Sequence, residues 1–469
     1  MLAGVAASSP VQASPWIDPG DVRMRHSLQR MSDAGHSPLL TSTWPLPWSD
    51  VAQAVRLTPG RTGAEVDVFH QRSYVQFELN RATRRAWSSE AVLGGATQAP
   101  LLRGFAALPR EQAELGVDRH WQGDRFAAAL DLTYADDPVE GFELRFDGSY
   151  LAGRIGGWVL GGGSIDRWWG PGWQSSLVLS TNARPVMGAW FQRQTTEPSQ
   201  WPGLSWMGPW QLTGFTGELD DDREVSGTQL SGMRLTMMPI QGLEIGASRT
   251  VLWGGDGQSG GLSGLRDAWF RDQEDDDAAR DLLALDMRYG FALGGRTAGV
   301  YAQTSVVDDG HGFSSRHSHL LGLDWTTPWW GADQQWFLEA VETARDEHDT
   351  YASGYRYNGR DLATSFDGDA LAVTLGLHHF FRNGHHLSGS LTRAELNRGG
   401  QLDSRLIDAP IPYAVADAET QFWAASIGYQ RTALGGWLEL RGEWRDHAFS
   451  TLDQDEDRWQ WAGRWRYRF

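Results

Sequence analysis

The chain has 469 residues and is rich in tryptophan, with 25 Trp beside 56 Gly, a composition typical of membrane-interface belts and many-stranded barrels. Its 59 acidic against 41 basic residues give a formal charge of −18, which argues against nucleic acid because a phosphate backbone would be repelled. The absence of cysteine excludes disulfides, thiolate metal sites and cysteine nucleophiles. The sequence contains no run of about 18 apolar residues, so a membrane-inserted form would be a closed barrel.

The first fifteen residues carry a trace of an export signal. They read MLAGVAASSPVQASP, and Val11-Gln12-Ala13 resembles the small-x-Ala site of signal peptidase. The basic region and most of the apolar core of such a signal are missing. We therefore interpret residues 1–15 as a residual signal peptide or a disordered terminus.

Residues 16–85 have the spacing of apolar side chains that predicts short helices. Asp18 is placed to cap the first helix, with Pro19 at its first position. The buried side of this helix is expected to carry Val22, Met24, Leu28 and Met31. Pro47 precedes a second short helix, and residues 63–85 are expected to hold a third. Together these residues predict a small helical segment ahead of the rest of the chain.

From residue 86 to residue 469 the apolar spacing changes to two, which predicts strands. The clearest case is the end of the chain, RWQWAGRWRYRF, where aromatic residues alternate with Arg and Gln up to Phe469. Neighbouring segments also carry charges of both signs on one face, and a sandwich core would not bury so many ions. We therefore expect an all-β transmembrane antiparallel barrel with lipid outside and a wet lumen inside.

Turns and loops agree with such a barrel. Arg382-Asn383-Gly384 is expected to form a three-residue hairpin loop with Gly384 in the left-handed region. Long polar connections span 271–281, 344–369 and 396–419, and short turns alternating with long loops are typical of outer-membrane barrels. The chain length indicates sixteen or eighteen strands.

The stretch DRWWGPGWQSSLVLSTNARP, residues 166–185, carries the candidate site. One interpretation is sugar binding, with indole rings stacking on pyranoses and polar groups binding hydroxyls or a uronate carboxylate. The other is a packed plug that fills the lumen, and it is the interpretation that we favour. The residues concerned are Trp168, Trp169, Gly170, Pro171, Trp173, Asn182, Arg184 and Pro185.

The sequence contains no motif for catalysis or for a metal. His311, His317 and His319 lack the spacing of metal ligands, and the acidic runs at 220–222 and 274–277 lack the alternating ligands of a calcium loop. No nucleophile elbow or metalloprotease motif is present. We therefore predict no catalytic residues, no metal site and no cofactor.

Three stretches resemble the Wzi family of capsule-assembly outer-membrane proteins. They are residues 18–51, the motif at 166–185 and the final RWRYRF. The resemblance implies an eighteen-stranded barrel with a helical bundle on the periplasmic side, and a lectin-like role in binding capsular or extracellular polysaccharide. The chain departs from the family pattern after Pro185, where it reads VMGAWFQR and lacks a second proline.

We predict a non-enzymatic outer-membrane protein of a Gram-negative bacterium that anchors or helps to assemble surface polysaccharide. The long loops are expected outside the cell and the helices in the periplasm. Expected partners are the polysaccharide, outer-membrane lipid and lipopolysaccharide, and the barrel-assembly machinery, which would recognise Phe469. The alternatives are a porin-like diffusion channel, favoured by the charged lumen, and an outer-membrane hydrolase.

Overall fold

A computed structural model describes residues 15–60, 66–84, 87–270, 279–308, 313–329, 332–345 and 350–469. The expectation for residues 1–15 therefore lies outside the described residues, except at residue 15. So do parts of the 271–281 and 344–369 connections, and His311. None of the described helices is both long and apolar enough to cross a membrane.

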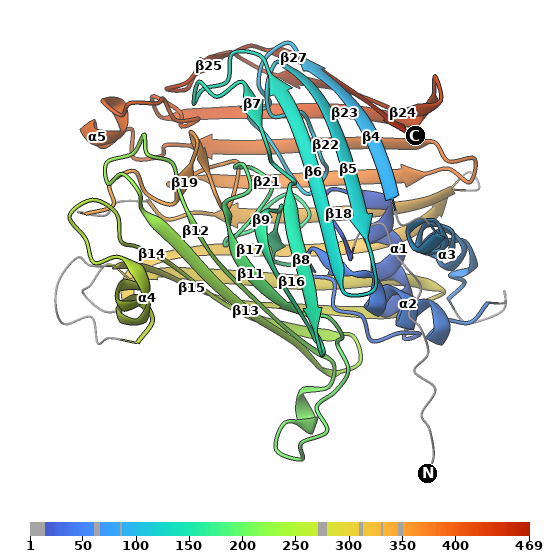
Figure 1. The fold of residues 1–469 in the computed structure, drawn as a ribbon. Coiled ribbons are helices and arrows are strands. Elements are labelled where there is room, and N and C mark those ends of the chain that lie inside the picture. Colours follow the sequence, from blue (N-terminus) through green and yellow to red (C-terminus); the bar gives the residue numbers. More distant parts are fainter. Residues whose placement is uncertain are drawn as a thin grey trace.

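The architecture is a closed antiparallel β-barrel (Figure 1). Its wall has eighteen strands among the described residues. The short strands β7 and β8 both pair with β6, so they count as one interrupted strand. The wall consists of β4 (Trp87–Ala96), β5 (Ala113–Gln122), β6 (Phe126–Ala135), β7 with β8 (Leu144–Arg145 and Tyr150–Ile155), β9 (Trp158–Ser164), β11 (Met187–Arg193), β12 (Trp210–Glu218), β13 (Gln229–Ile240), β14 (Leu243–Trp253), β15 (Ala279–Leu293), β16 (Arg296–Asp308), β17 (Phe313–Trp329), β18 (Ala332–Glu342), β21 (Leu371–Phe380), β22 (His386–Leu396), β23 (Thr420–Ala433), β24 (Gly436–Arg445) and β27 (Trp459–Arg468).

The barrel closes where β27 pairs with β4, for example through Arg468 opposite Glu90. The prediction of an all-β barrel is confirmed, and the larger of the two predicted strand numbers is the observed one. Closure leaves no free sheet edge, which satisfies every wall strand on both sides.

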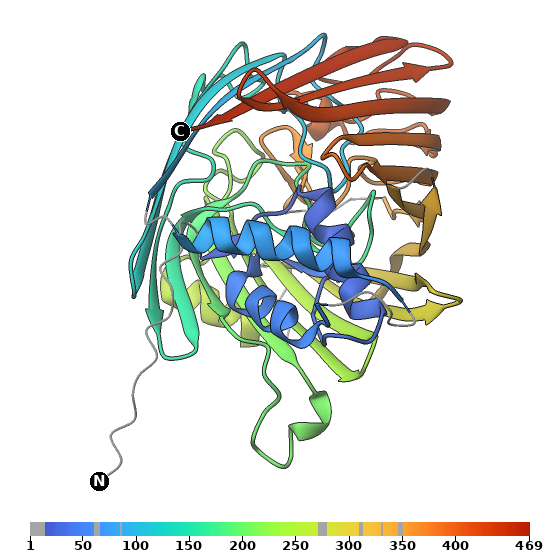
Figure 2. The same cartoon turned by 90° about the vertical axis from the view of Figure 1, so that its right-hand side faces the viewer.

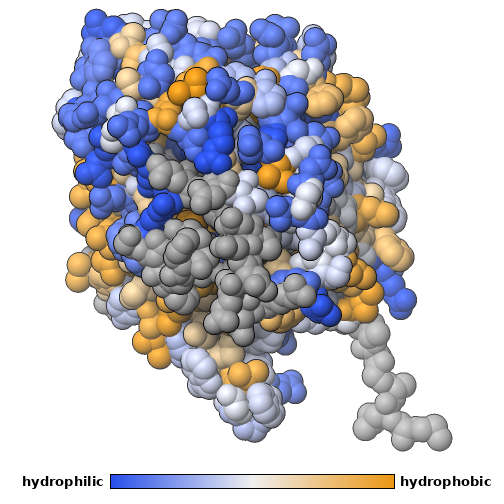
Figure 3. Space-filling model, turned by 90° about the vertical axis from the view of Figure 1, so that its left-hand side faces the viewer, coloured by the Kyte–Doolittle hydropathy of each residue, from blue (hydrophilic) through white to orange (hydrophobic). Residues whose placement is uncertain are grey.

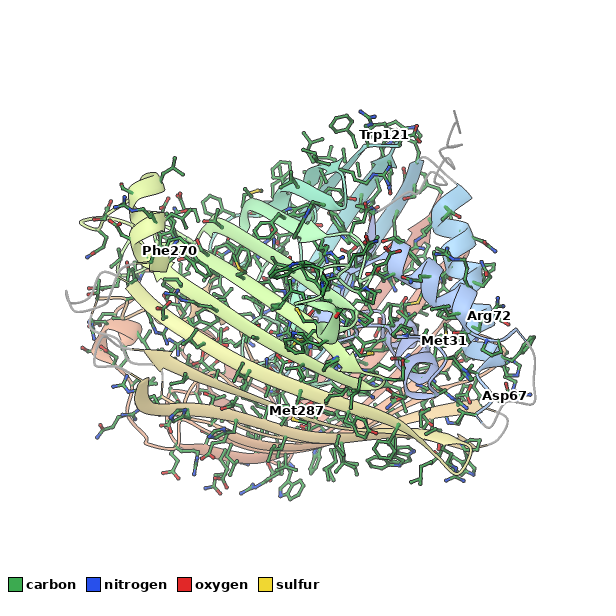
Figure 4. All side chains as sticks on the ribbon, turned by 90° about the horizontal axis from the view of Figure 1, so that it is seen from below. Met31, Asp67, Arg72, Trp121, Phe270 and Met287 are labelled. Atoms are coloured by element: carbon green, nitrogen blue, oxygen red, sulfur yellow. The ribbon has the colours of Figure 1, made fainter. Side chains whose placement is uncertain are left out.

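The period-two pattern sets the outer surface. Leu440 and Ile427 are 51% and 59% exposed on the outside, while their chain neighbours Arg441 and Gly428 face the lumen. Met287 of β15 lies on the outer surface at 46% exposure, whereas Met31 is fully buried (Figure 4). The exposed apolar side chains form the band that a bilayer would cover.

The two ends of the barrel differ in their connections. At one end, which we call the short-turn end, adjacent strands are joined by turns such as 241–242, 294–295 and 434–435. The Arg382–Gly384 loop is confirmed there, because the Phe381 amide donates to the His385 carbonyl at 3.0 Å and Gly384 has φ +89°. The other end, the long-loop end, carries connections such as 97–112, 165–186 and 397–419.

Three helices occupy the short-turn end, namely α1 (Val22–Asp33), α2 (Trp48–Leu57) and α3 (Phe69–Arg84) (Figures 1 and 2). Arg30 of α1 and Gln71 of α3 both bind Asp333 near the start of β18, at 2.6 and 2.5 Å. The predicted cap of α1 is wrong. Asp21 is the cap, accepting from the Met24 amide at 2.8 Å, because the helix begins at Val22, three residues after Pro19.

The remaining elements are small and lie in the connections. The short strands form the pairs β1 (Trp16–Ile17) with β3 (Leu46–Pro47), β2 (Thr43–Trp44) with β10 (Trp168–Trp169), β19 (Arg356–Tyr357) with β20 (Arg360–Asp361), and β25 (Phe449–Ser450) with β26 (Asp455–Glu456). The helical pieces are α4 (Gly261–Phe270), α5 (Ser404–Ile407) and a 3₁₀ turn at Ser205–Met207.

The described part of the 344–369 connection folds into the barrel mouth instead of standing as a polar loop. Tyr351, Tyr355 and Phe366 are each less than 5% exposed. Arg356 of β19 donates to Asp367 at 2.8 Å and thereby closes the segment on itself. The three large aromatic rings of this otherwise polar stretch are therefore removed from water by packing inside the barrel.

Candidate functional site

The motif at 166–185 lies inside the barrel. Trp168 and Trp169 form β10, which pairs with β2 of the N-terminal segment, placing Trp168 opposite Trp44. Trp168, Trp169 and Trp173 are 1%, 0% and 2% exposed. The structure therefore brings the three predicted tryptophans together as a lumenal plug, with their ring faces covered by protein.

The plug's backbone is held by a carboxylate from the wall. Glu339 of β18 accepts hydrogen bonds from the amides of Trp173 at 2.8 Å and Ser175 at 2.7 Å. The Gln174 amide, at 3.3 Å, and the Tyr301 hydroxyl, at 3.1 Å, complete its shell. A buried carboxylate with four donors fixes the turn, because each charge-assisted bond is stronger than a neutral one.

A second wall residue binds the other side of the turn. The Gln303 amide oxygen accepts from the Leu177 amide at 2.9 Å, and its nitrogen donates to the Trp169 carbonyl at 3.0 Å. Sequence alternation places Gln303 and Glu339 on the inner face. It gives no signal that they contact the plug rather than water.

The Gly-Pro-Gly turn is required by close approach. A Cβ on Gly172 would lie 2.2 Å from the Ser175 carbonyl oxygen and 2.9 Å from the Glu339 carboxylate. Gly170 has φ +158°, and a Cβ there would lie 2.7 Å from the Gln303 amide oxygen. The two glycines thus let the backbone reach its wall partners.

Arg25 of α1 joins the helices to the plug. Its guanidinium lies 4.2 Å from the Trp173 ring centre and 4.4 Å from that of Phe105, and it donates to the Pro171 carbonyl at 2.6 Å. Burial lowers the pKa of Arg25 to about 10, which leaves it charged at neutral pH. The cation stacked between two rings is a stabilising contact that the sequence analysis missed.

The end of the motif organises the mouth of the barrel. The Asn182 amide donates to the Asp361 carbonyl at 2.8 Å, tying the motif to the 350–370 segment. Arg184 binds Asp147 through two nitrogens at 2.7 and 2.9 Å and also pairs with Glu140. The Pro185 carbonyl accepts from the Ser164 hydroxyl at 2.6 Å.

Buried ion pairs fasten the N-terminal segment to the wall. Arg288 of β15 contacts Asp33 of α1 at 2.7 Å and Asp324 of β17 at 3.0 Å. Glu244 accepts from the amides of Thr41 and Ser42, both at 2.9 Å. Part of the ionic inner face therefore faces protein rather than the solvent expected from the sequence.

A cavity of about 870 Å³ occupies the remaining lumen. It is bounded by the plug, by residues 103–108, by α1 and α3, and by the inner faces of β4–β6, β22–β24 and β27. A separate hollow of about 20 Å³ is lined by Arg184, Asn358 and Arg360 in the connections of the long-loop end. Among the described residues, no three His, Cys, Asp or Glu side chains are grouped to hold a metal ion.

The chain is similar in sequence and in fold to known capsule-assembly proteins. The family model described as capsule assembly protein Wzi matches residues 82–460. An uncharacterized 55.8 kDa protein of the cps region of Klebsiella pneumoniae is 26% identical over 330 residues, which is 69% of this chain and 64% of that protein. The solved structure of Wzi from Escherichia coli, described as an outer-membrane protein involved in group 1 capsule assembly and a carbohydrate-binding β-barrel, is 22% identical. It superposes with a TM-score of 0.82 over 97% of this chain and 99% of its own.

Proposed function

Since the chain belongs to the Wzi family of capsule assembly proteins, we propose that it is an outer-membrane lectin that retains capsular or extracellular polysaccharide at the cell surface. The observation that carries the proposal is the plug. It closes the barrel with three tryptophans that are at most 2% exposed, so the long-loop end offers a surface to a polymer instead of a passage through the wall. A plugged barrel supports binding over the porin-like and hydrolytic alternatives.

The orientation follows from the two ends. The last residue, Phe469, and helices α1–α3 share the short-turn end, which we assign to the periplasm together with the helical segment 16–85. The barrel 86–469 then carries the long loops outside, and this end is largely hydrophilic, with hydrophobic residues along its flanks (Figure 3). In this orientation Phe469 is available to the barrel-assembly machinery, and the flanks meet lipid and lipopolysaccharide.

The motif residues are assigned to closure. The donors of Arg184 are engaged by Asp147 and Glu140, and Asn182 is only 4% exposed. In contrast, Arg360 has one hydrogen bond, to the Pro100 carbonyl at 2.9 Å, and no ion pair with any described residue. It lines the 20 Å³ hollow together with Glu111, Glu140 and Asp453, a mixed lining that is suited to one hydroxyl group of a sugar. Many such weak contacts along a repeating polymer would give firm retention without catalysis or a cofactor.

The test is removal of the gene, followed by measurement of polysaccharide in the cell-bound and released fractions. We expect the polymer to move to the released fraction, and complementation to restore it. Arg360→Ala is expected to weaken retention, whereas Arg398→Ala, which breaks a rim ion pair with Glu342, serves as the matched control. An unchanged partition in the deletion strain, or shortened polymer after incubation with purified protein, would refute the binding role.

A further inference from the structure

The 870 Å³ cavity opens away from the surface assigned to capsule binding. Its lining includes Ser88, Gly384, Trp437 and Phe469, which all lie at the short-turn end. Its inner limit is formed by the plug, through Trp173 and Gln174, and by residues 103–108 of the 97–112 connection. Figure 2 shows α3 lying across this end of the barrel. The volume falls within the range of about 300 to 1,000 Å³ that is usual for ligand pockets.

One side of the cavity presents arginines over small residues. Arg464 and Arg466 of β27 and Arg441 of β24 line it. The neighbouring inward positions are the small residues Ser388, Gly428 and Gly94, and Glu439 of β24, which lies directly opposite Arg464. Arg464 has no hydrogen bond or ion pair with any described residue, and its Nε is buried without an acceptor. No hydrogen bond joins Glu439 to Arg464, so the donors of Arg464 can bind a planar carboxylate by two parallel hydrogen bonds.

The cavity wall at β5 and β6 carries two carboxylates that form no ion pair with an arginine of the described residues. Asp118 of β5 and Asp131 of β6 are directly opposite each other on adjacent strands. Asp118 has His120 at 3.5 Å, and Asp131 accepts from the Thr133 hydroxyl at 3.1 Å. These oxygens can accept from hydroxyl donors, but they repel a compact dianion such as phosphate.

An aromatic ring of the helical segment also lines the cavity. Phe77 of α3 lines the cavity and is 61% exposed, while Val75 and Leu79 of the same helix are packed inside. A large exposed ring beside a polar cavity is suited to a ligand with one apolar face.

We propose that this cavity is a second saccharide site, opening to the short-turn end, for an acidic sugar. Arg464 and its neighbours bind the carboxylate, Asp118 and Asp131 accept hydroxyl hydrogens, and Phe77 covers the C–H face of the ring. This site does not depend on polysaccharide binding at the long-loop end. It gives the protein a ligand on the opposite side of the membrane from the capsule.

The test uses the full chain purified in detergent and titrated calorimetrically with D-glucuronate, D-glucose and inorganic phosphate. We expect glucuronate to bind at least tenfold more tightly than glucose, and Arg464→Gln to weaken it by about tenfold, the loss of one charge-assisted contact. Arg431→Gln, an exposed arginine of β23 at the same end outside the cavity lining, should have no effect. Asp118→Asn with Asp131→Asn should weaken both sugars.

A cysteine reporter tests access, since the chain has no cysteine of its own. Asn80→Cys on α3 faces the cavity, and glucuronate should slow its labelling by a thiol reagent while glucose does not. Unchanged glucuronate affinity in Arg464→Gln, equal affinity for glucose, or displacement of glucuronate by equimolar phosphate would overturn the proposal. Retention of capsule by Arg464→Gln cells should be normal, which separates this site from the proposed surface function.

Discussion

Glu339→Gln is expected to release the plug while leaving the wall intact. The carboxylate binds three backbone amides and the Tyr301 hydroxyl. Glutamine has one acceptor oxygen, so its NH₂ group must face at least one amide N–H, either that of Ser175 or that of Trp173. Losing one charge-assisted bond and weakening the others to neutral ones costs about 3 to 4 kcal/mol. The population of barrels with a detached plug should therefore rise by about 100-fold or more.

Conductance in planar bilayers measures this directly. The unmodified protein should show little current, and Glu339→Gln should show openings more than tenfold as frequent, with unchanged heat-modifiable migration on gels. Glu342→Gln is the matched control, because Glu342 lies on the same strand in an exposed pair with Arg398, and such pairs contribute at most about 1 kcal/mol. If Glu339→Gln conducts no more than Glu342→Gln, the carboxylate does not hold the plug.

Three further outcomes are expected. Gly172→Ala should lower stability by about 1 to 3 kcal/mol in thermal melts, because its Cβ would meet the Ser175 carbonyl oxygen at 2.2 Å; Gly157→Ala, with open space around it, should melt like the unmodified protein. Trp168→Ala should lower the free energy of unfolding by about 3 to 5 kcal/mol. Trp168→Phe should cost less and should preserve polysaccharide binding, because the buried indole N–H has no acceptor among the described residues. Loss of binding in Trp168→Phe with a normal melt would contradict the plug assignment. Burial raises the pKa of Asp50 to about 7, so near neutral pH the native state binds a proton that the unfolded chain has lost. The free energy of unfolding should therefore increase by about 1.5 kcal/mol from pH 7 to pH 5.5. Asp50→Asn should lack this increase, and an equal increase in both proteins would refute the role of Asp50.

The wall could be predicted in detail because lipid imposes a strict rule on it. Every second residue must be apolar where it meets hydrocarbon, and this period predicts the last strand, which the structure places at Trp459–Arg468 within the stretch RWQWAGRWRYRF. The turn at Gly384 could be predicted for the same reason, since register and loop length have to agree. The cap of α1 could not, because Asp18 and Asp21 are both acceptable caps and tertiary packing decides where the helix begins.

The lumen could not be predicted because a polar inward residue has two possible surroundings. Glu339 binds the plug, whereas Asp118 faces the cavity, yet both occupy the inner face of a strand and have the same signature. The burial of the 350–370 segment was also hidden. Its polar residues pair with one another, as Arg356 does with Asp367. Its polar composition therefore predicts a solvent-exposed loop, although the segment is buried inside the barrel.

The free energy needed to expose the buried tryptophans decides between the two interpretations of the motif, sugar binding and a packed plug. For a sugar to stack on Trp168, Trp169 or Trp173, the plug must leave the interior, because the rings are at most 2% exposed. Each ring buries about 150 to 250 Å², so exposing all three costs roughly 11 to 19 kcal/mol. A micromolar ligand supplies only about 8 kcal/mol in total. A glycan therefore cannot open the plug with its own binding energy, and retention of the polymer has to come from side chains outside the plug, such as the half-buried Arg360 at the long-loop end.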